Sequence, residues 1–219
     1  MFFKLVAIFL ALIQVVGSDF GLTSALIGAG ASLAGTTTNA LMANNGYSVT
    51  CGIETENFSR WPLSDPKVYV VSGYVRDPPR EVHPAKREAM VTHKTDSTAT
   101  GTSGTVSWRV GNTDYRIIVM WSAPYSFDFH SNWMGVGIIG RDEHNKDWFD
   151  KMYYRNGPFV RGEYYYHSET IKYCNDKICV SGNMGTSHKP LINIKVVPVN
   201  CKADAAPILQ PYCEGSRRR

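Results

Sequence analysis

Two short apolar runs, joined by a loop rich in aromatic residues, occupy residues 115–139, which read YRIIVMWSAPYSFDFHSNWMGVGII. The runs, Tyr115–Trp121 and Trp133–Ile139, are rich in β-branched and aromatic residues, which is typical of strands. The loop between them alternates Tyr and Phe with Ser, Pro, Asp and Asn, which are turn-forming residues. This stretch therefore predicts two strands joined by a loop that presents aromatic side chains.

Runs of the same kind continue in both directions along the chain. They predict further strands at Tyr47–Ile53, Lys67–Tyr74, Glu88–His93, Gly104–Val110, Tyr165–Tyr173, Lys177–Ser181 and Leu191–Val199. One helical segment interrupts them, because apolar residues pair at helical spacing between residues 148 and 153, with Asp142 as a candidate N-cap and Gly157-Pro158 as the stop. The pattern predicts a mainly β fold, a single-domain β-sandwich flanked by two α-helices, one N-terminal and one near residues 142–154.

Length and charge bound the class of protein. With 219 residues, 43% hydrophobic and 19% charged, the chain fits one globular domain with a substantial core. Three of the charges behind the formal net charge of +4 lie in the C-terminal run Arg217–Arg219, so the folded body is close to neutral. A nucleic-acid partner is therefore not expected, since it would require a basic surface.

The first residues have the pattern of a secretory signal peptide. Lys4 precedes an apolar run from Leu5 to Val16, and small side chains follow at the predicted cleavage site before Ser18. The run is too short to span a bilayer, so we expect a secreted product that starts at Ser18. A retained N-terminal anchor is the alternative.

The segment that follows carries no charge between Phe20 and Ile53. Apolar residues fall near one face at helical spacing, and the hydrophobic positions assigned to this helix are Phe20, Leu22, Leu26 and Leu33. A helix from Phe20 to Asn39 would be about 30 Å long, the thickness of the hydrocarbon core of a membrane. Its glycines each cost about 1 kcal/mol, so we expect a marginal helix that a membrane or a partner stabilises. The alternative is an arm packed permanently on the sandwich.

Five cysteines in a secreted chain permit disulfides. The simplest pairing is local, Cys174 with Cys179 and Cys201 with Cys213, which leaves Cys51 over. The six histidines are scattered and match no zinc pattern, so no metal site is expected. The triplet Asn57-Phe58-Ser59 is a glycosylation sequon, although such triplets are often unused.

Enzyme motifs are weak in this chain. The run Gly101-Thr102-Ser103-Gly104 lacks the final glycine of a nucleophile elbow, and Gly28-Ala29-Gly30 is followed by Leu33 where a dinucleotide motif has glycine. We therefore expect neither an enzyme nor a cofactor.

Aromatic residues are concentrated between Trp121 and Tyr166, which hold 13 of the 26 Phe, Trp and Tyr residues. Aromatic side chains on exposed loops suit the interface of a membrane, and a cage of rings suits a quaternary ammonium group. The same composition also fits an aromatic-rich core.

Several short motifs, in order and at matching spacing from about Gly46 to Val199, resemble the actinoporins, the sea-anemone pore-forming cytolysins, and their mollusc relatives. The motifs are Gly52-Ile53-Glu54, Trp61, Tyr69–Gly73, Ala99-Thr100-Gly101, Ser122-Ala123-Pro124-Tyr125, Phe129-His130-Ser131-Asn132-Trp133, Met152-Tyr153-Tyr154 and Pro158-Phe159.

The resemblance implies a β-sandwich toxin, monomeric in solution, that recognises the phosphocholine head group of sphingomyelin. The toxin would then insert its N-terminal helix and assemble as a homo-oligomer into a cation-permeable pore in the target-cell membrane. Matched position by position, the phosphocholine site would comprise Ser72, Ser103, Ser122, Pro124, His130, Phe149, Tyr153 and Tyr154, and the membrane-anchoring aromatics would be Phe129 and Trp133. The chain then divides into a signal peptide (1–17), a membrane-inserting helix segment (18–45), the sandwich (46–200) and a Cys-containing C-terminal extension (201–219).

The chain departs from the family pattern inside this site. His130 and Phe149 stand where the family has Tyr, Ser103 stands where it has Val, and a protonated His130 would repel choline. The N-terminal helix keeps only Asp19 of its acidic residues. A non-lytic module that binds a lipid head group or a glycan in a lectin-like way is therefore the alternative function, and a protein that acts through protein partners is a third.

Overall fold

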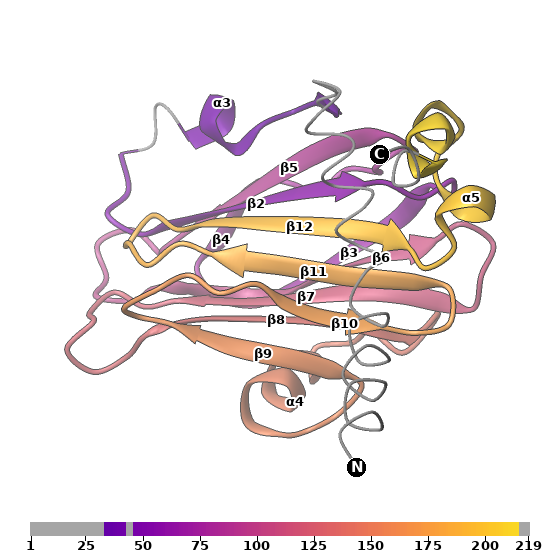
Figure 1. Ribbon diagram of the computed structural model, residues 1–219. Coiled ribbons are helices and arrows are strands. Elements are labelled where there is room, and N and C mark those ends of the chain that lie inside the picture. Colours follow the sequence, from indigo (N-terminus) through magenta and orange to yellow (C-terminus); the bar gives the residue numbers. More distant parts are fainter. Residues whose placement is uncertain (1–32, 43–45, 215–219) are drawn as a thin grey trace, which may run out of the picture.

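The computed structural model describes residues 33–42 and 46–214 of the chain. Figure 1 shows two sheets stacked on one another, with α3 (Thr38–Met42) on the outer side of one sheet, α4 (Trp148–Tyr154) on the outer side of the other and α5 (Cys201–Asp204) at one end. The predicted signal peptide and the helix residues Phe20, Leu22 and Leu26 lie outside the described residues.

The first sheet has seven strands. They are β1 (Ala34–Gly35), β2 (Thr50–Asn57), β4 (Tyr74–Asp77), β5 (Lys86–His93), β10 (Ile171–Cys174), β11 (Ile178–Met184) and β12 (Leu191–Pro198). Their order is β1-β5-β2-β12-β11-β10, and β4 also pairs with β5. The pairs β1–β5 and β2–β12 are parallel, and the other pairs are antiparallel.

The second sheet has five strands in the order β3-β6-β7-β8-β9, all antiparallel. They are β3 (Leu63–Ser72), β6 (Thr102–Val110), β7 (Tyr115–Ala123), β8 (Asn132–Gly140) and β9 (Phe159–Tyr164). The first quoted stretch of sequence forms β7, β8 and the loop between them, so the predicted β-sandwich with flanking helices is confirmed.

Strand β7 shows why the sequence reads as a continuous apolar run. Ile117, Val119 and Trp121 face the core between the sheets, whereas Ile118 and Met120 face outward. The outward residues are also buried, because the helix α4 covers them with Trp148, Phe149 and Met152. A strand buried on both faces has no polar alternation to display.

The predicted strand Tyr165–Tyr173 is wrong in its position. The chain pairs with β8 earlier, as β9, and again later with β11, as β10. Tyr165 and Tyr166 lie in the exposed loop between the two strands, so aromatic residues with high strand propensity form a surface loop here. The short strand β4 was not predicted as a separate strand.

The helix near residues 142–154 is confirmed, but its predicted start at Asp142 is wrong. The helix begins at Trp148 with Asp147 at the N-cap, and the Asp147 side chain makes no capping hydrogen bond. Residues 141–147 form a loop instead, because this segment carries the buried side chain of His144 onto the outer face of β6.

The predicted helix does not continue through residues 33–37. Gly35 has φ of +149° and pairs with β5, where any side chain would collide with the carbonyl oxygen of Arg87. Leu33 is buried against Phe58 and Leu209, so this part of the N-terminal segment is packed on the sandwich. None of the helices in the described ranges is long and apolar enough to cross a membrane.

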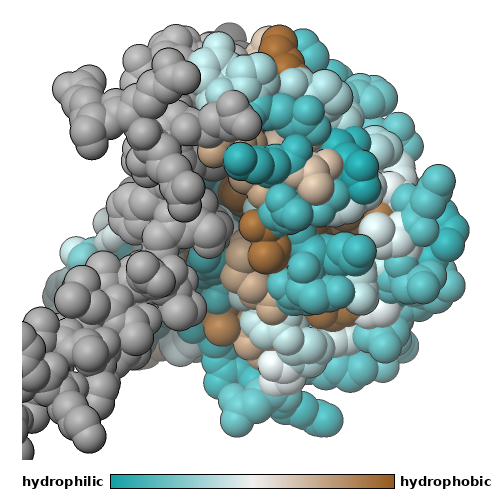
Figure 2. All heavy atoms as spheres, turned by 45° about the vertical axis from the view of Figure 1, so that its right-hand side comes forward, coloured by the Kyte–Doolittle hydropathy of each residue, from teal (hydrophilic) through white to brown (hydrophobic). Residues whose placement is uncertain are grey.

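The C-terminal segment completes one end of the molecule. Helix α5 and the 3-10 helix η1 (Pro207–Glu214) bury Ala205, Ala206 and Leu209 against the ends of β2 and β12. Figure 2 turns this side forward and shows a mainly hydrophilic described surface, with hydrophobic residues gathered in a central strip.

Both predicted disulfides are confirmed, Cys174–Cys179 and Cys201–Cys213. Cys51 is a free, buried thiol, and burial raises its pKa far above the usual value. The sequon residue Asn57 is buried and donates through Nδ2 to the carbonyl oxygens of Trp61 and Val82, so it is inaccessible for glycosylation in the folded chain.

Candidate functional site

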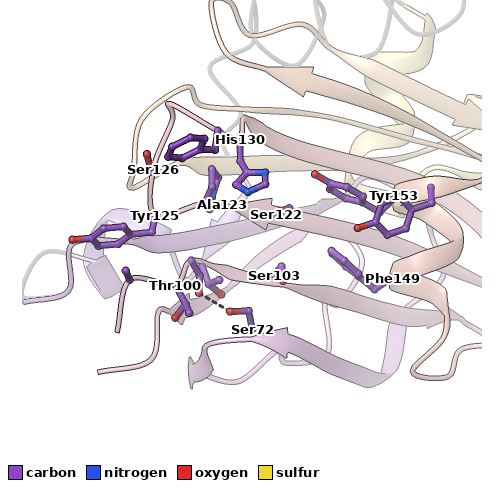
Figure 3. Close-up of a pocket in the computed structure, with 16 residues that line it drawn as sticks. Ser72, Thr100, Ser103, Ser122, Ala123, Tyr125, Ser126, His130, Phe149 and Tyr153 are labelled. Atoms are coloured by element: carbon purple, nitrogen blue, oxygen red, sulfur yellow. Dashed lines mark hydrogen bonds between the residues drawn. The ribbon is translucent and has the colours of Figure 1, made fainter. Parts of the chain in front are cut away.

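A cavity of about 460 Å³ opens where β3, β6 and β7 meet the loop after β7 and the helix α4 (Figure 3). The cavity brings together all eight residues that the family resemblance assigns to head-group binding. They are Ser72, Ser103, Ser122, Pro124, His130, Phe149, Tyr153 and Tyr154, and Phe129 lines the cavity as well.

Three serines on neighbouring strands form a row along the sheet. In the antiparallel register, Ser72 of β3 lies opposite Ser103 of β6, and Ser103 lies opposite Ser122 of β7. Directly opposite residues project from the same face of a sheet, about 5 Å apart. The Ser72 hydroxyl donates to the Gly101 carbonyl oxygen at 3.0 Å, the dashed line of Figure 3. Within the described ranges, the hydroxyls of Ser103 and Ser122 have no hydrogen-bond partner, so both are available to a ligand.

Helix α4 supplies an aromatic wall, which we define as Phe149, Tyr153 and Tyr154. The rings of Phe149 and Tyr153 are stacked with centroids 5.4 Å apart, and the rings of Tyr153 and Tyr154 meet edge to face at 4.8 Å. Phe149 is buried, whereas Tyr154 is 70% exposed. The wall therefore runs from the core to the solvent, and Figure 3 shows it opposite the loop that carries Tyr125 and His130.

Trp133, the second predicted membrane-anchoring aromatic, is half-buried and is not among the residues that line the cavity. Its ring lies 5.7 Å from that of Tyr153, so it contacts the aromatic wall. Its anchoring role stays a prediction.

The loop between β7 and β8 is fixed at its base and exposed at its tip. Asn132 donates through Nδ2 to the carbonyl oxygens of Gly185 and Ser187, each at 3.0 Å. The His188 ring donates through Nε2 to the Tyr125 carbonyl oxygen at 3.0 Å. Phe129, at the tip, is 81% exposed. An exposed ring on an anchored loop suits insertion into an interface.

The lining of the cavity contains neither a carboxylate nor a lysine or arginine. Burial is the main cause that raises the pKa of Tyr153, so its hydroxyl stays protonated at neutral pH and can donate a hydrogen bond. Within the described part of the chain, no group of three or more metal-ligating side chains occurs. The site thus offers hydroxyls and ring faces.

Residues that the prediction did not include also line the cavity, namely Ala99, Thr100, Gly101, Thr102, Ala123, Tyr125 and Ser126. A side chain at Gly101 would collide with the carbonyl oxygen of Ala123, so only glycine lets the start of β6 approach the end of β7 this closely. The motif Ala99-Thr100-Gly101 was the available signal, since it is part of the family resemblance.

A comparison with known protein families shows which family the chain is related to. Residues 23–197 match the family described as sea anemone cytotoxic protein. The chain belongs to this family. The resemblance to the actinoporins is thereby confirmed, and the family is one of cytotoxins, in agreement with the prediction that the chain is not an enzyme.

Two curated proteins are similar over most of the chain. Tereporin-Ca1 from Terebra anilis is 43% identical, in an alignment that covers 78% of this chain and 96% of that protein. Echotoxin-2 from Monoplex parthenopeus is 38% identical, in an alignment that covers 78% of this chain and 65% of that protein.

Among solved structures, the lipid binding protein Nakanori has a similar fold. The TM-score is 0.59 at 12% sequence identity, over 72% of this chain and 75% of that one. At this identity the likeness concerns the fold alone.

Proposed function

We propose that this protein is a pore-forming cytolysin that docks on the phosphocholine head group of sphingomyelin through the cavity. The observation that carries the proposal is the pair of partner-free hydroxyls, Ser103 and Ser122, facing an aromatic wall in a site without fixed charge. The family match and the mollusc relatives support the cytolytic activity.

The chemistry of the cavity suits the two ends of phosphocholine. The quaternary ammonium group is attracted to ring faces, which Tyr153 and Tyr154 offer at the mouth. The phosphate accepts hydrogen bonds, and the hydroxyls of Ser103 and Ser122 are placed on one row to donate them. Hydroxyl donors in place of lysine or arginine leave a zwitterionic head group preferred over an anionic one.

The exposed rings beside the cavity would then anchor the protein in the membrane. Phe129 and Tyr154 are exposed, while Trp133 packs behind Tyr153. Phe129 would enter the interface, and Trp133 would hold the aromatic wall in place.

In the proposed mechanism, residues 18–45 insert within a homo-oligomer, which requires residues 33–42 to detach from the sandwich. Detachment breaks the parallel pairing of β1 with β5 and two side-chain hydrogen bonds. The Thr38 amide donates to Glu54 Oε2 at 3.1 Å, and Arg76 donates to the Leu41 carbonyl oxygen at 3.2 Å. The apolar contact is Leu33 against Phe58 and Leu209.

The test is dye release from vesicles of phosphatidylcholine with and without sphingomyelin, with co-sedimentation of the same samples. We expect both binding and release to depend on sphingomyelin. A Ser103→Ala/Ser122→Ala double variant should lose most of that dependence, whereas Ser181→Ala on β11 of the other sheet should behave like the unmodified protein. Full binding by the double variant would refute the head-group site. Equal binding to both vesicles would refute the preference for sphingomyelin, because phosphatidylcholine carries the same phosphocholine head group.

The alternative is a non-lytic module that uses the same cavity to hold a lipid head group or a glycan. The burial of Leu33 on the sandwich favours it, because a permanently packed arm would not insert. Sphingomyelin-dependent binding without release would select this alternative.

A further inference from the structure

Arg161 of β9 reaches the end of helix α4 that carries the exposed part of the aromatic wall. Its guanidinium donates through Nη1 to the carbonyl oxygens of Met152 and Arg155, both at 2.9 Å. These two carbonyl groups directly precede and follow the pair Tyr153-Tyr154 in the chain. Arg161 therefore holds the backbone on both sides of the two tyrosines.

A short helix needs such a partner at its C-terminal end. The last carbonyl groups of any helix lack partners within the helix, and a positive charge at that end is favourable. Helix α4 has seven residues, and its C-cap, Arg155, is already extended, with φ of −122° and ψ of 178°. Within the described residues, Arg161 is the side chain that donates to these carbonyl groups.

The register of β9 explains how the Arg161 guanidinium reaches the C-terminal end of α4. Arg161 lies opposite Gly135 on β8, and a Cβ atom at Gly135 would lie only 3.0 Å from the Met152 methyl group. The missing side chain at Gly135 lets α4 lie close to the sheet beside Arg161.

The register of β9 also determines which face of the sheet each of Arg161, Gly162 and Glu163 occupies. Successive residues of a strand point to opposite faces. Arg161 and Glu163 therefore share the outer face, while Gly162 lies against Tyr164 and Ile171. Arg161 is therefore on the face of β9 on which α4 packs.

We propose that Arg161 is the positioning residue of the binding site: by bracketing Tyr153 and Tyr154, it holds their rings in the orientation that receives the head group. Fixing a binding group in its bound conformation before the ligand arrives increases affinity, because the ordering cost is no longer paid on binding. The effect of Arg161 on lipid binding rests on the proposed function, whereas its contacts with the end of α4 do not.

The test compares Arg161→Met with Arg155→Met in the full chain. Both changes remove one positive charge at the end of α4, but only Arg161 donates to the two carbonyl groups. We expect Arg161→Met to weaken sphingomyelin-dependent binding about tenfold, equivalent to about 1.4 kcal/mol. Arg161→Lys, which keeps the charge but not the forked donor geometry, should restore part of the loss.

Amide hydrogen exchange without lipid provides the second readout. Arg161→Met should speed exchange at residues 153–156, and Arg155→Met should not. Unchanged exchange in Arg161→Met, or an equal loss of binding in Arg155→Met, would overturn the proposal. If the unmodified protein shows no sphingomyelin dependence, the proposed function fails, and the exchange data alone decide whether Arg161 positions the tyrosines. If Arg161→Met does not fold, Arg161→Lys serves for both measurements.

Discussion

The outer face of strand β6 carries one row of hydroxyl groups, and its two ends differ. Ser103, Thr105 and Ser107 alternate along the strand and share this face, while the residues between them point toward the core. At one end Ser107 and Thr105 bond to the buried ring of His144. At the other end Ser103 opens into the cavity, near the exposed side chain of His130.

We call the end of the row at Ser107 and Thr105 the closed end and the end at Ser103 the open end. At the closed end the polar side chains form a continuous chain of hydrogen bonds. Arg116 Nε donates to Ser107 Oγ at 2.9 Å, and Ser107 Oγ is hydrogen-bonded to His144 Nδ1 at 2.7 Å. On the other side of the ring, His144 Nε2 is hydrogen-bonded to Thr105 Oγ1 at 2.9 Å. Arg116 itself is buried and pairs with Asp65 at 2.9 Å.

The two ends use the same residue types, so residue type alone does not mark a site. What differs is the partner. At the closed end each ring nitrogen of His144 has a hydroxyl partner, and the polar groups fix the loop before α4. At the open end two hydroxyls are left without partners, which is the condition for binding a ligand.

The largest expected effect concerns the closed end and the pH dependence of stability. Burial, with the charges of Arg116 and Lys67 adding to it, lowers the pKa of His144 to about 4. The unfolded chain binds a proton at this histidine near pH 6.5 and the folded chain only near pH 4, so between these values protonation favours the unfolded state. The free energy of unfolding should therefore fall by up to about 3 kcal/mol as the pH drops from about 6.5 to about 4.

Urea unfolding at a series of pH values between 7 and 4 measures this slope. His144→Gln should flatten it, and His130→Gln should leave it as in the unmodified protein. Identical slopes in all three proteins would show that the closed end does not carry the pH dependence.

The second expected effect concerns the aromatic support of the open end. Replacing Trp133 and Tyr154 together by Ala removes a ring behind Tyr153 and the exposed ring of the wall. Binding to sphingomyelin vesicles should fall about a hundredfold without loss of the fold, because two ring contributions of about 1 to 2 kcal/mol each are lost. Co-sedimentation measures binding, and near-ultraviolet circular dichroism with thermal unfolding checks the fold. Retained binding would show that the site is placed wrongly.

A matched pair of substitutions compares the two ends directly. Ser122→Ala should weaken sphingomyelin-dependent binding about tenfold and leave stability nearly unchanged, since the lost hydroxyl has no protein partner within the described residues. Thr105→Val should do the reverse and destabilise the fold by about 1 to 2 kcal/mol, because His144 Nε2 loses its hydrogen-bond partner. Both quantities are measured on both variants, and equal effects of the two changes on binding would remove the distinction.

The smallest expected effect concerns charge at the mouth of the cavity, where His130 lies. His130→Lys places a positive charge there that repels the choline cation, so binding to sphingomyelin vesicles should weaken a few-fold. His130→Gln, which adds no charge, should bind like the unmodified protein in the same co-sedimentation assay. Equal binding by the Lys and Gln variants would show that the head group does not approach His130.

Local patterns in the sequence predicted the sheets and the members of the open site. The β-branched runs gave the strands, and the short family motifs identified eight residues that the fold brings to one cavity. The closed end was not predicted, because His144 lies 37 residues from Ser107 and 39 from Thr105, and nothing local indicates that a scattered histidine will be buried. The early start assigned to α4 failed for the same reason, since the long-range contact of His144 overrides the capping signal of Asp142.

The contribution of Gly35 was also not readable locally. Its Ala- and Gly-rich surroundings suit a helix, and the strand forms only because β5 accepts a backbone with no side chain. The role of Arg161 was likewise not readable from the sequence, because it depends on the fold, which brings β9 beside the end of α4.

The parallel pairing of β2 with β12 sets a condition on the timing of folding. The centre of the larger sheet joins Thr50–Asn57 to Leu191–Pro198, so it remains incomplete until nearly all of the chain has been synthesised. Pairing between strands so far apart in sequence is slow, typically milliseconds to seconds. A nascent chain therefore cannot complete the larger sheet, on which the N-terminal segment packs, before β12 has been synthesised.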